Sequence, residues 1–242
     1  MDFKKLKNEH KHLRRRIIEI SHKKSLSHLG SCLTAVDIIG AVYQAKKKDE
    51  PFVLSSGHAA VALYAVLEKQ GSLREDSLMQ LNIHPDRNAS YGIDVSSGSL
   101  GHGLGIATGM ALGDRKKNVY CLISDGECAE GSIWEALNIA VENKLSNLNI
   151  LVNANGWAAY KKVDISSLLR KFKGFGLNPV SINTCDPDDI VKALSRNAGT
   201  KSVPLLLLIK TKSEQMPFLK GLDAHYYVMS EKDFKFAMEI LS

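Results

Sequence analysis

Three apolar runs constrain the fold of this chain more than any other feature of its sequence. They are NVYCLIS at 118–124, LNILVN at 148–153 and VPLLLLIK at 203–210, and none shows the strict polar–apolar alternation of a half-exposed strand. Segments with helical periodicity separate them. Strands that are buried on both faces and joined by helices are typical of a parallel sheet. We therefore predict an α/β fold with a doubly wound, mainly parallel sheet, helices on both faces, and one domain over residues 1–242.

The other elements follow from periodicity and from turn residues. Two shorter strands are predicted at PFVLS (51–55) and PVSIN (179–183), and an irregular stretch rich in Gly, Ser, Asn and Asp covers 82–99. Thr34 and Asp37 stand three residues apart before an apolar run, a spacing that predicts a capping box at a helix start. Helices are predicted over 3–23, from 34, from 57, and over 100–112, 132–143, 165–173, 188–195 and 231–241.

Composition is typical of a soluble protein from a reducing compartment. Apolar residues make up 44% of the chain, and the longest apolar run, VPLLLLI, is far shorter than the ~20 residues that cross a bilayer. The opening MDFKKLKNEHKHLRRR is too charged for the apolar region of a secretory signal. The cysteines, which lack disulfide-rich spacing, are Cys32, Cys121, Cys128 and Cys185. We expect a cytoplasmic protein with no membrane attachment.

The net charge of +6 is concentrated near the N-terminus. A basic arm that binds nucleic acid is one interpretation of this segment. Apolar residues at helical spacing favour instead a helix whose charged face is solvated or docks on another chain; they are Phe3, Leu6, His10, Leu13, Ile17 and Ile20. Since no aromatic interleaving or nucleic-acid motif accompanies the charges, we expect no nucleic-acid partner.

Two strand ends carry polar residues that can bind a metal ion. Asp125 follows NVYCLIS and Asn155 follows LNILVN, and in a doubly wound sheet ligands bind beyond the carboxyl ends of the strands. Both residue types also make ordinary turns. Mg²⁺ prefers oxygen ligands, which an Asp, an Asn and a nearby main-chain carbonyl can supply alongside phosphate and water. Glycines at 126, 131 and 156 allow close approach of a bulky ligand, and the helix start near 131 favours an anion.

The spacing of these residues resembles the thiamine diphosphate signature, in which a (G)DG triplet opens a segment that closes in Asn-Gly. Asp125-Gly126 and Asn155-Gly156 match it, thirty positions apart. Between them, EGSIWEA and KLSNLNILVNANG resemble the EGxxWEA and KLxNLxxxxDxNG motifs of the transketolase family. Further motifs of that family are matched by SLSHLGSCLTAVDII, FVLSSGHAAVALYAVL, IHPD, SSGSLGHGLGIATGMAL and AHYYVMSEKDF, so the resemblance extends over most of the chain.

The resemblance to transketolases implies a thiamine-diphosphate-binding fold and a set of site residues. Asp125, the Asn155 side chain and the Trp157 carbonyl are expected to bind Mg²⁺ (or Ca²⁺) that bridges the cofactor diphosphate. His28, His84 and His225 are the expected catalytic residues, the first two through hydrogen bonds to the donor sugar. The residues expected around thiamine diphosphate are His58, Gly98, Ser99, Leu100, Gly126, Glu127, Glu130 and His225, together with Asp125 and Asn155.

The same resemblance implies an activity and a partner. Transketolases transfer a two-carbon ketol unit from a ketose or ketose phosphate to an aldose acceptor. Full-length members carry, after this region, a C-terminal domain and a pyrimidine-binding domain whose glutamate activates the cofactor. We therefore expect the N-terminal subunit of a split transketolase, which is inactive unless a separately encoded C-terminal subunit is present and which forms an α2β2 heterotetramer with it. Glu130 is expected in a network that links the two cofactor sites of that assembly.

Four positions or stretches depart from the family pattern. Ser124 stands where GDG has its first glycine, His102 stands where Gln is common, and Asn153 replaces a frequent Asp. The stretch AAYKKVD at 158–164 does not resemble the usual continuation, so substrate contacts in this stretch are not assigned.

Alternative interpretations bear on the same residues. Cys121 and Cys128 suggest zinc, but their strand–helix context lacks the usual ligand spacing. Gly101, Gly103 and Gly105 suggest a dinucleotide loop, but no apolar strand precedes them and the GxGxxG spacing is not kept. The α subunit of a 2-oxo-acid dehydrogenase shares the fold and the metal motif, although SLSHLG and LSSGHAA favour transketolase. A non-catalytic homologue that keeps the cofactor pocket is a third possibility.

Overall fold

The computed structural model describes residues 7–184, 186–196 and 202–242. Within them, five strands form one sheet in the order β1-β2-β3-β5-β4. Every neighbouring pair is parallel, which confirms the predicted fold class. The strands are β1 (Phe52–Leu54), β2 (Val119–Ser124), β3 (Leu148–Ala154), β4 (Val180–Ile182) and β5 (Leu205–Lys210).

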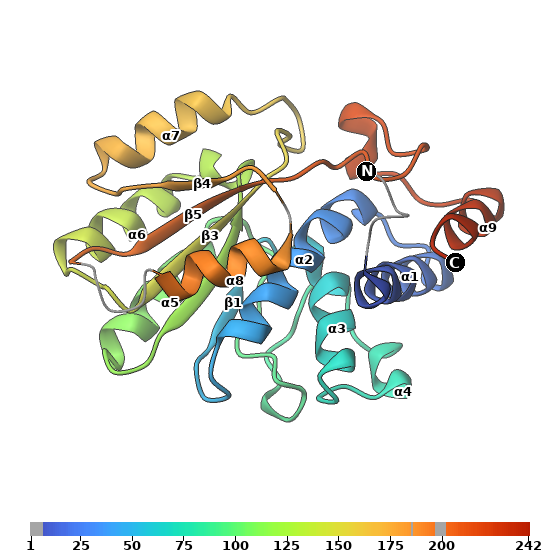
Figure 1. Ribbon diagram of the computed structural model, residues 1–242, viewed down its shortest axis with the longest axis horizontal. Coiled ribbons are helices and arrows are strands. Elements are labelled where there is room, and N and C mark those ends of the chain that lie inside the picture. Colours follow the sequence, from blue (N-terminus) through green and yellow to red (C-terminus); the bar gives the residue numbers. More distant parts are fainter. Residues whose placement is uncertain (1–6, 185, 197–201) are drawn as a thin grey trace.

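Helices cover both faces of the sheet (Figure 1). One face carries α5 (His102–Gly113), α6 (Gly131–Glu142) and α7 (Ile165–Gly174). The other carries α2 (Leu29–Ala45), α3 (Ala60–Lys69) and α8 (Pro187–Arg196), with α1 (Asn8–Lys23) and α9 (Glu231–Ile240) packed against the same core. A short helix α4 (Glu75–Leu78) follows α3, and 3-10 turns lie at Gly57–Ala59, Ala89–Tyr91, Glu127–Ala129 and Gly221–His225. None of the helices described is long and apolar enough to cross a membrane.

Successive residues of the central strands pack into different cores. Leu122 of β2 and Leu207 of β5 belong to the core beneath α2 and α3, whereas Cys121 and Leu206 belong to the core beneath α5 and α6. All four side chains are fully buried. These strands are apolar throughout because both of their faces are buried, and a polar side chain on either face would lose its hydration.

The start of α2 differs from the prediction. The helix begins at Leu29, after His28 in a left-handed backbone conformation (φ 64°), and not near Thr34. The capping box is wrong as well, because the Thr34 hydroxyl donates to the carbonyl of Ser31 and the Asp37 carboxylate is 3% exposed in an ion pair with Arg14. A helix that is buried on nearly all sides has no amphipathic periodicity to mark its first turn.

The basic N-terminal segment forms α1 from Asn8, and the part of the predicted helix that contains Phe3 and Leu6 lies outside the described residues. Its apolar face is buried as predicted, at Leu13, Ile17 and Ile20. The expectation of a fully solvated charged face is wrong at two positions. Arg14 is fully buried, and Arg16 pairs with Glu68 of α3 at 2.8 Å.

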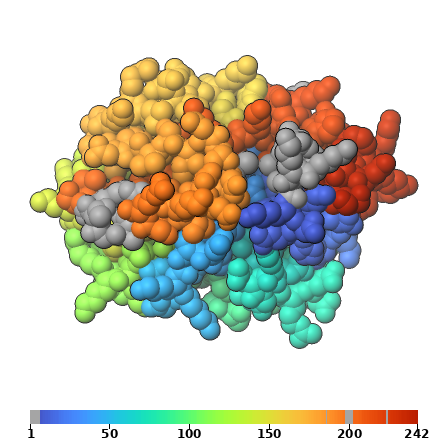
Figure 2. Space-filling model, viewed as in Figure 1, coloured from blue at the N-terminus to red at the C-terminus, as the bar shows by residue number. Residues whose placement is uncertain are grey.

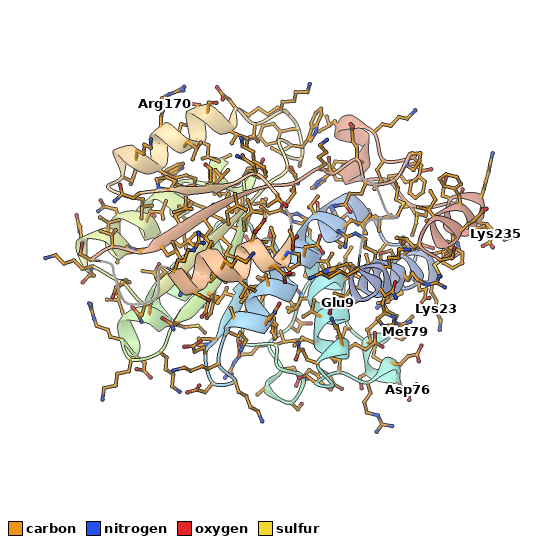
Figure 3. All side chains as sticks on the ribbon, in the orientation of Figure 1. Glu9, Lys23, Asp76, Met79, Arg170 and Lys235 are labelled. Carbon is orange, nitrogen blue, oxygen red and sulfur yellow. The ribbon has the colours of Figure 1, made fainter. Side chains whose placement is uncertain are left out.

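Helix α1 lies between α3 and the C-terminal residues of the chain (Figure 2). Glu9 of α1 lies beside α3 (Figure 3), where its carboxylate accepts a hydrogen bond of 2.6 Å from Lys69. On the opposite side of α1, His22 stacks on Phe234 of α9 with ring centroids 4.3 Å apart. The charges of α1 therefore serve mainly to hold neighbouring helices of the same chain.

Candidate functional site

The loops that follow β2 and β3 meet at the carboxyl edge of the sheet. Asp125 is only 2% exposed, and its two carboxylate oxygens accept hydrogen bonds from the amides of Gly126 (2.9 Å) and Gly156 (2.6 Å). The side-chain oxygen of Asn155 accepts a hydrogen bond of 2.9 Å from the amide of Trp157. The two strand ends singled out in the sequence are thus held together by direct contacts between their loops.

Gly126 brings the third predicted metal ligand close to Asp125. A Cβ added at Gly126 would lie 2.8 Å from Cα of Ala158 and 3.2 Å from the carbonyl oxygen of Trp157. Only glycine permits this approach, because distances below 3.0 Å between such atoms require the backbone to move. The Trp157 carbonyl therefore lies beside the turn that contains Asp125.

The oxygen atoms at this edge fit a hard divalent cation. Burial raises the pKa of the Asp125 carboxyl to about 7, although three main-chain amides lower it. A nearby cation would offset that desolvation, and a carboxylate, an amide oxygen and a carbonyl oxygen are ligands that Mg²⁺ and Ca²⁺ accept. Among the described residues, no group of three or more His, Cys, Asp or Glu side chains is placed to hold a metal, so a metal site here would also draw on the amide and carbonyl oxygens.

The two cysteines considered for zinc are buried thiols. Cys121 lies within β2 and Cys128 follows Asp125 in a 3-10 turn. Burial raises the pKa of both thiols well above the ordinary value, which disfavours the thiolate that zinc requires. Cys185 lies outside the described residues.

Three of the predicted histidines form one cluster beside the edge of the sheet that carries Asn155 and Trp157. Ring centroids are 4.6 Å apart for His28 and His225, 5.3 Å for His28 and His58, and 5.4 Å for His58 and His225. Burial lowers the pKa of His58 to about 3 and that of His28 to about 4, and it also lowers the pKa of His225. These imidazoles are neutral at pH 7, so each can donate one hydrogen bond and accept another.

His84 approaches the same cluster through the loop that contains Gly98. A Cβ at Gly98 would lie 3.0 Å from the His84 ring, and Gly98 has a φ of 146°. The same loop packs on Gly57, immediately before His58, where an added Cβ would lie 2.7 Å from the Gly98 nitrogen. Ser99 is exposed and Leu100 is half-buried at the rim of this loop. The structure therefore brings all four predicted histidines to one region.

Glu127 has a different environment from the other predicted cofactor residues. Its side chain is fully buried, and one oxygen accepts hydrogen bonds from the Ser55 hydroxyl (2.5 Å) and the Gly101 amide (2.7 Å). The other oxygen accepts a bond of 3.3 Å from the Ser124 amide. Glu127 therefore joins the ends of β1 and β2 to the start of α5. Glu130, three residues later, is exposed at the N-terminus of α6.

Several residues near the site were not singled out in the sequence for a role there. A small cavity is lined by Asn155, Trp157 and His225, and also by Ser31 and Ser213. Ser31 and Ser213 belong to segments distant in sequence. Ser31 lies within the motif SLSHLGSCLTAVDII, in which only His28 was assigned a role, and no pattern marks Ser213. Their proximity to the metal edge is visible only in the folded chain.

The departure at Asn153 has a structural explanation. Its amide nitrogen donates to the Thr34 hydroxyl at 2.9 Å, and its amide oxygen accepts from the Thr211 hydroxyl at 2.6 Å. An Asp at this position can accept from both hydroxyls but has no proton to donate when ionised. Asn153 thus fixes the end of β3 to α2 and to the segment after β5.

Comparison with known proteins identifies the family of the chain. The family described as "Transketolase, thiamine diphosphate binding domain" matches residues 8–214. Transketolase-like protein 2 of Bos taurus is 34% identical over 212 residues, which cover 76% of this chain and 33% of that protein. An apulose-4-phosphate transketolase subunit of Phocaeicola vulgatus is 29% identical over 256 residues, covering 95% and 91%. The 6-deoxy-6-sulfo-D-fructose transketolase subunit SqwG of Clostridium sp. is 30% identical over 259 residues, covering 93% and 92%.

Solved transketolases share the fold. The enzyme from Campylobacter jejuni superposes with a TM-score of 0.83 at 24% identity, over 97% of this chain and 42% of that one. The enzyme from Leishmania mexicana gives a TM-score of 0.82 at 21% identity, over 98% and 41%. The chain thus spans less than half the length of these enzymes and most of the length of the two matched subunits. It belongs to the transketolase family, of which it contains the thiamine diphosphate binding domain.

Proposed function

We propose that this chain is the diphosphate-binding subunit of a two-chain transketolase. The assembled enzyme transfers a two-carbon ketol unit from a ketose or ketose phosphate to an aldose acceptor. The observation that carries this proposal is the position of the Asp125–Asn155–Trp157 edge beside the cluster of His28, His58 and His225. A metal and diphosphate site next to neutral hydroxyl-binding groups suits a sugar substrate.

The proposed cofactor site uses residues of three loops. Asp125, the Asn155 side chain and the Trp157 carbonyl hold Mg²⁺ (or Ca²⁺), and the close packing of Gly126 against Ala158 keeps that carbonyl near Asp125. Gly98, Ser99 and Leu100 lie on the loop that approaches His58. Bound thiamine diphosphate supplies the carbon nucleophile on which ketol transfer depends. Glu127 supports this site indirectly, since its carboxylate is already used by Ser55 and Gly101.

The histidines are proposed to orient the donor sugar. Nδ1 of His28 is buried and has no hydrogen-bond partner among the described residues, so it is free for a substrate hydroxyl. Its main-chain amide donates to the carbonyl of His225 at 3.1 Å, which fixes the two rings relative to each other. His28 and His225, which are neutral at pH 7, then bind hydroxyls without the cost of burying a charge, and His84 is proposed to bind a further hydroxyl of the donor sugar.

A separately encoded C-terminal subunit is the proposed partner. The matched relatives from Phocaeicola vulgatus and Actinobacillus succinogenes are themselves named as subunits of a transketolase. Helix α5, HGLGIATGMALG, contains no charged residue, and yet Ile106 is 40% exposed and Leu112 is 37% exposed. A helix that is apolar on all sides is typical of a buried position, so its outer face fits an interface with another chain. By analogy with the family we propose an α2β2 assembly in the cytoplasm, inactive without the partner.

The test is reconstitution with the candidate partner. A reading frame that encodes a transketolase C-terminal half beside this one identifies that partner. We expect ketol transfer from ketose phosphates to aldoses only when both purified chains, thiamine diphosphate and Mg²⁺ are present. A proven complex of the two chains that transfers no ketol unit across a broad panel of sugars contradicts the proposal. Oxidative decarboxylation of a 2-oxo acid by a mixture with a different β chain supports the 2-oxo-acid dehydrogenase alternative.

A further inference from the structure

We propose that the chain has a second ligand site, an anion-binding pocket for a small phosphorylated ligand. It is formed by the hairpin Trp157–Val163 together with residues of α6 and α7. This hairpin overlaps the stretch AAYKKVD, whose sequence does not follow the transketolase pattern. The inference concerns binding alone and does not depend on the proposed ketol transfer.

The pocket is a cavity of about 540 Å³, within the range that holds small metabolites. Its basic wall consists of Lys161, Lys162 and Lys171. Trp134 and Ser167 line the same cavity, and Asp125 and Gly126 line it on the side of the proposed metal ligands. A ligand there would lie next to the loop that carries the proposed metal ligands.

Each of the three ammonium groups lies over an aromatic ring. Nζ of Lys161 is 5.4 Å from the centroid of the Tyr160 ring, and Nζ of Lys162 is 5.2 Å from that of Trp157. Nζ of Lys171 is 5.9 Å from the centroid of the Trp134 ring. Contact with an aromatic face positions an ammonium group without neutralising its charge.

These lysines have no acidic partner in the described part of the chain, in contrast to other lysines on its surface. Lys7 pairs with Asp188 at 2.7 Å and Lys69 pairs with Glu9 at 2.6 Å, whereas no comparable ion pair involves the pocket lysines. Three unneutralised cations at one cavity make a local positive potential that attracts anions.

The acidic groups that face the pocket do not cancel this charge. Asp164 caps α7, and its carboxylate accepts a hydrogen bond of 3.0 Å from the Ser167 amide. Asp125 is buried and directs its two oxygens toward the amides of Gly126 and Gly156. The cavity is therefore lined by two carboxylates and three ammonium groups, so the net charge of its lining is positive.

The hairpin holds two of the lysines in fixed positions. The amide of Ala158 donates to the carbonyl of Lys161 at 2.8 Å, and the amide of Val163 donates to the carbonyl of Gly156 at 2.9 Å. A β-bridge also pairs Trp157 with Lys162. Because the backbone is already ordered, binding an anion has little conformational entropy to overcome at this point.

A phosphate group matches this set of donors. Its oxygens accept several hydrogen bonds at once, and ammonium groups together with a hydroxyl such as that of Ser167 can surround it. The cavity is larger than one phosphate ion, so it leaves space for a sugar-sized remainder. The common chemistry is a phosphate group, which either inorganic phosphate or a phosphorylated metabolite can bring.

The experiment measures phosphate binding by the full chain. A chelator is present and thiamine diphosphate is absent, so that the proposed metal-dependent site does not contribute to the measured binding. Inorganic phosphate and a hexose phosphate are titrated at constant ionic strength by calorimetry. Fluorescence provides a second readout, since the sequence has two tryptophans, Trp134 and Trp157, and both contact pocket lysines. We expect saturable binding that the triple variant Lys161→Ala/Lys162→Ala/Lys171→Ala weakens at least tenfold.

A matched variant separates a specific site from general charge. Lys116→Ala/Lys173→Ala/Lys232→Ala removes the same charge from exposed positions that do not line the cavity, and Lys173 comes from the same helix as Lys171. Unchanged affinity in this control supports the site, whereas equal losses in both triple variants overturn it. Tenfold tighter binding of the hexose phosphate identifies a metabolite as the ligand, and equal affinities identify inorganic phosphate.

Two further results also overturn the pocket. One is the absence of saturable binding for both probes. The other is that the pocket variant binds phosphate normally but associates poorly with the C-terminal subunit, which assigns the lysines to a protein interface. Metal-dependent binding of thiamine diphosphate is measured separately on each variant, so a failure of this pocket is distinguishable from a failure of the cofactor site.

Discussion

The main-chain amide of Gly156 donates a hydrogen bond of 2.6 Å to the carboxylate of Asp125, and this bond joins the loops after β3 and β2. Gly156 can make it because its φ is 84°, in the region that favours glycine. The bond leaves Asp125 buried, and that burial raises the pKa of its carboxyl to about 7. A carboxylate in this state gains stabilisation from a bound cation, which is the physical basis of the first prediction.

Asp125→Ala should abolish Mg²⁺-dependent binding of thiamine diphosphate while leaving the fold intact. Loss of a direct ligand is expected to weaken binding by at least about 100-fold, the upper range seen for mere supporting residues. Calorimetry of the assembled complex measures the affinity, and circular dichroism checks the fold. Asp76→Ala is the control, since Asp76 is exposed on α4 (Figure 3). Wild-type affinity in Asp125→Ala refutes the metal assignment.

Replacement by alanine should destabilise the chain at Glu127 and have little effect at Glu130. Glu127→Ala leaves the Gly101 amide and the Ser55 hydroxyl without their buried acceptor, and we expect a loss of about 3 kcal/mol in unfolding free energy. Glu130 is exposed, so Glu130→Ala should change that value by less than about 0.5 kcal/mol. Urea unfolding of the isolated chain compares the two. Similar losses in both variants contradict the proposed bridging role of Glu127.

Alanine at Gly105 and Gly109 should stabilise the chain and weaken its assembly. Both glycines are exposed on α5, and an added Cβ meets no atom within 4 Å. Each replacement should add up to about 1 kcal/mol of stability, because Gly disfavours a helix interior. The added methyl groups should obstruct a partner that packs closely on this face, which ultracentrifugation with the C-terminal subunit can measure. Undiminished association in the double variant places the interface elsewhere.

Gly103 provides the contrast within the same helix. A Cβ at this position would lie 2.5 Å from the Ser55 Cβ, so Gly103→Ala forces α5 away from the end of β1. Overpacking of this kind costs about 1–3 kcal/mol. A lower melting temperature for Gly103→Ala, alongside a higher one for the Gly105 and Gly109 variants, is the expected pattern.

The buried histidines should make the isolated chain less stable in acid. The pKa of His58 is lowered to about 3 from an ordinary value of 6.5, so the unfolded chain binds more protons between these pH values. Stability from this group is complete above pH 6.5 and decreases as the pH falls toward 3. His58→Gln removes the contribution, and the difference in unfolding free energy between pH 7 and pH 4 should become smaller than in the wild type. Identical pH dependence of the two proteins contradicts this expectation.

Local sequence predicted the strands that are buried on both faces and the helices that keep one face in water. The apolar runs of β2, β3 and β5 predicted strands that are buried on both faces. Five predicted helices are present with ends within two residues of the predicted bounds, namely those at 100–112, 132–143, 165–173, 188–195 and 231–241. The start of α2 was missed because Leu29–Ala45 is buried on nearly every side and shows no periodic face. Periodicity locates a helix only where one face remains in water.

The proximity of the loops that carry Asp125 and Asn155 could be predicted from their spacing along the chain. Asp125 and Asn155 follow consecutive strands, so parallel topology brings them together. The buried role of Glu127 depends on Ser55, 72 residues away. The burial of Arg14 depends on its ion pair with Asp37 and on the hydrogen bond that it donates to Gln215, 201 residues away. No local pattern distinguishes these buried charged side chains from solvated ones, because their burial depends on contacts that form only when the chain folds.

The position of β5 between β3 and β4 affects how the chain is made. On the ribosome, β3 has an open edge until residues 205–210 emerge, and β4, which pairs only with β5 in the described sheet, has no partner before then. An apolar strand with unpaired main-chain groups is a template for aggregation. Nascent chains therefore pass through a stage at which chaperones can bind the unpaired strands. A stalled product that ends before Leu205 should precipitate under conditions in which the finished protein does not.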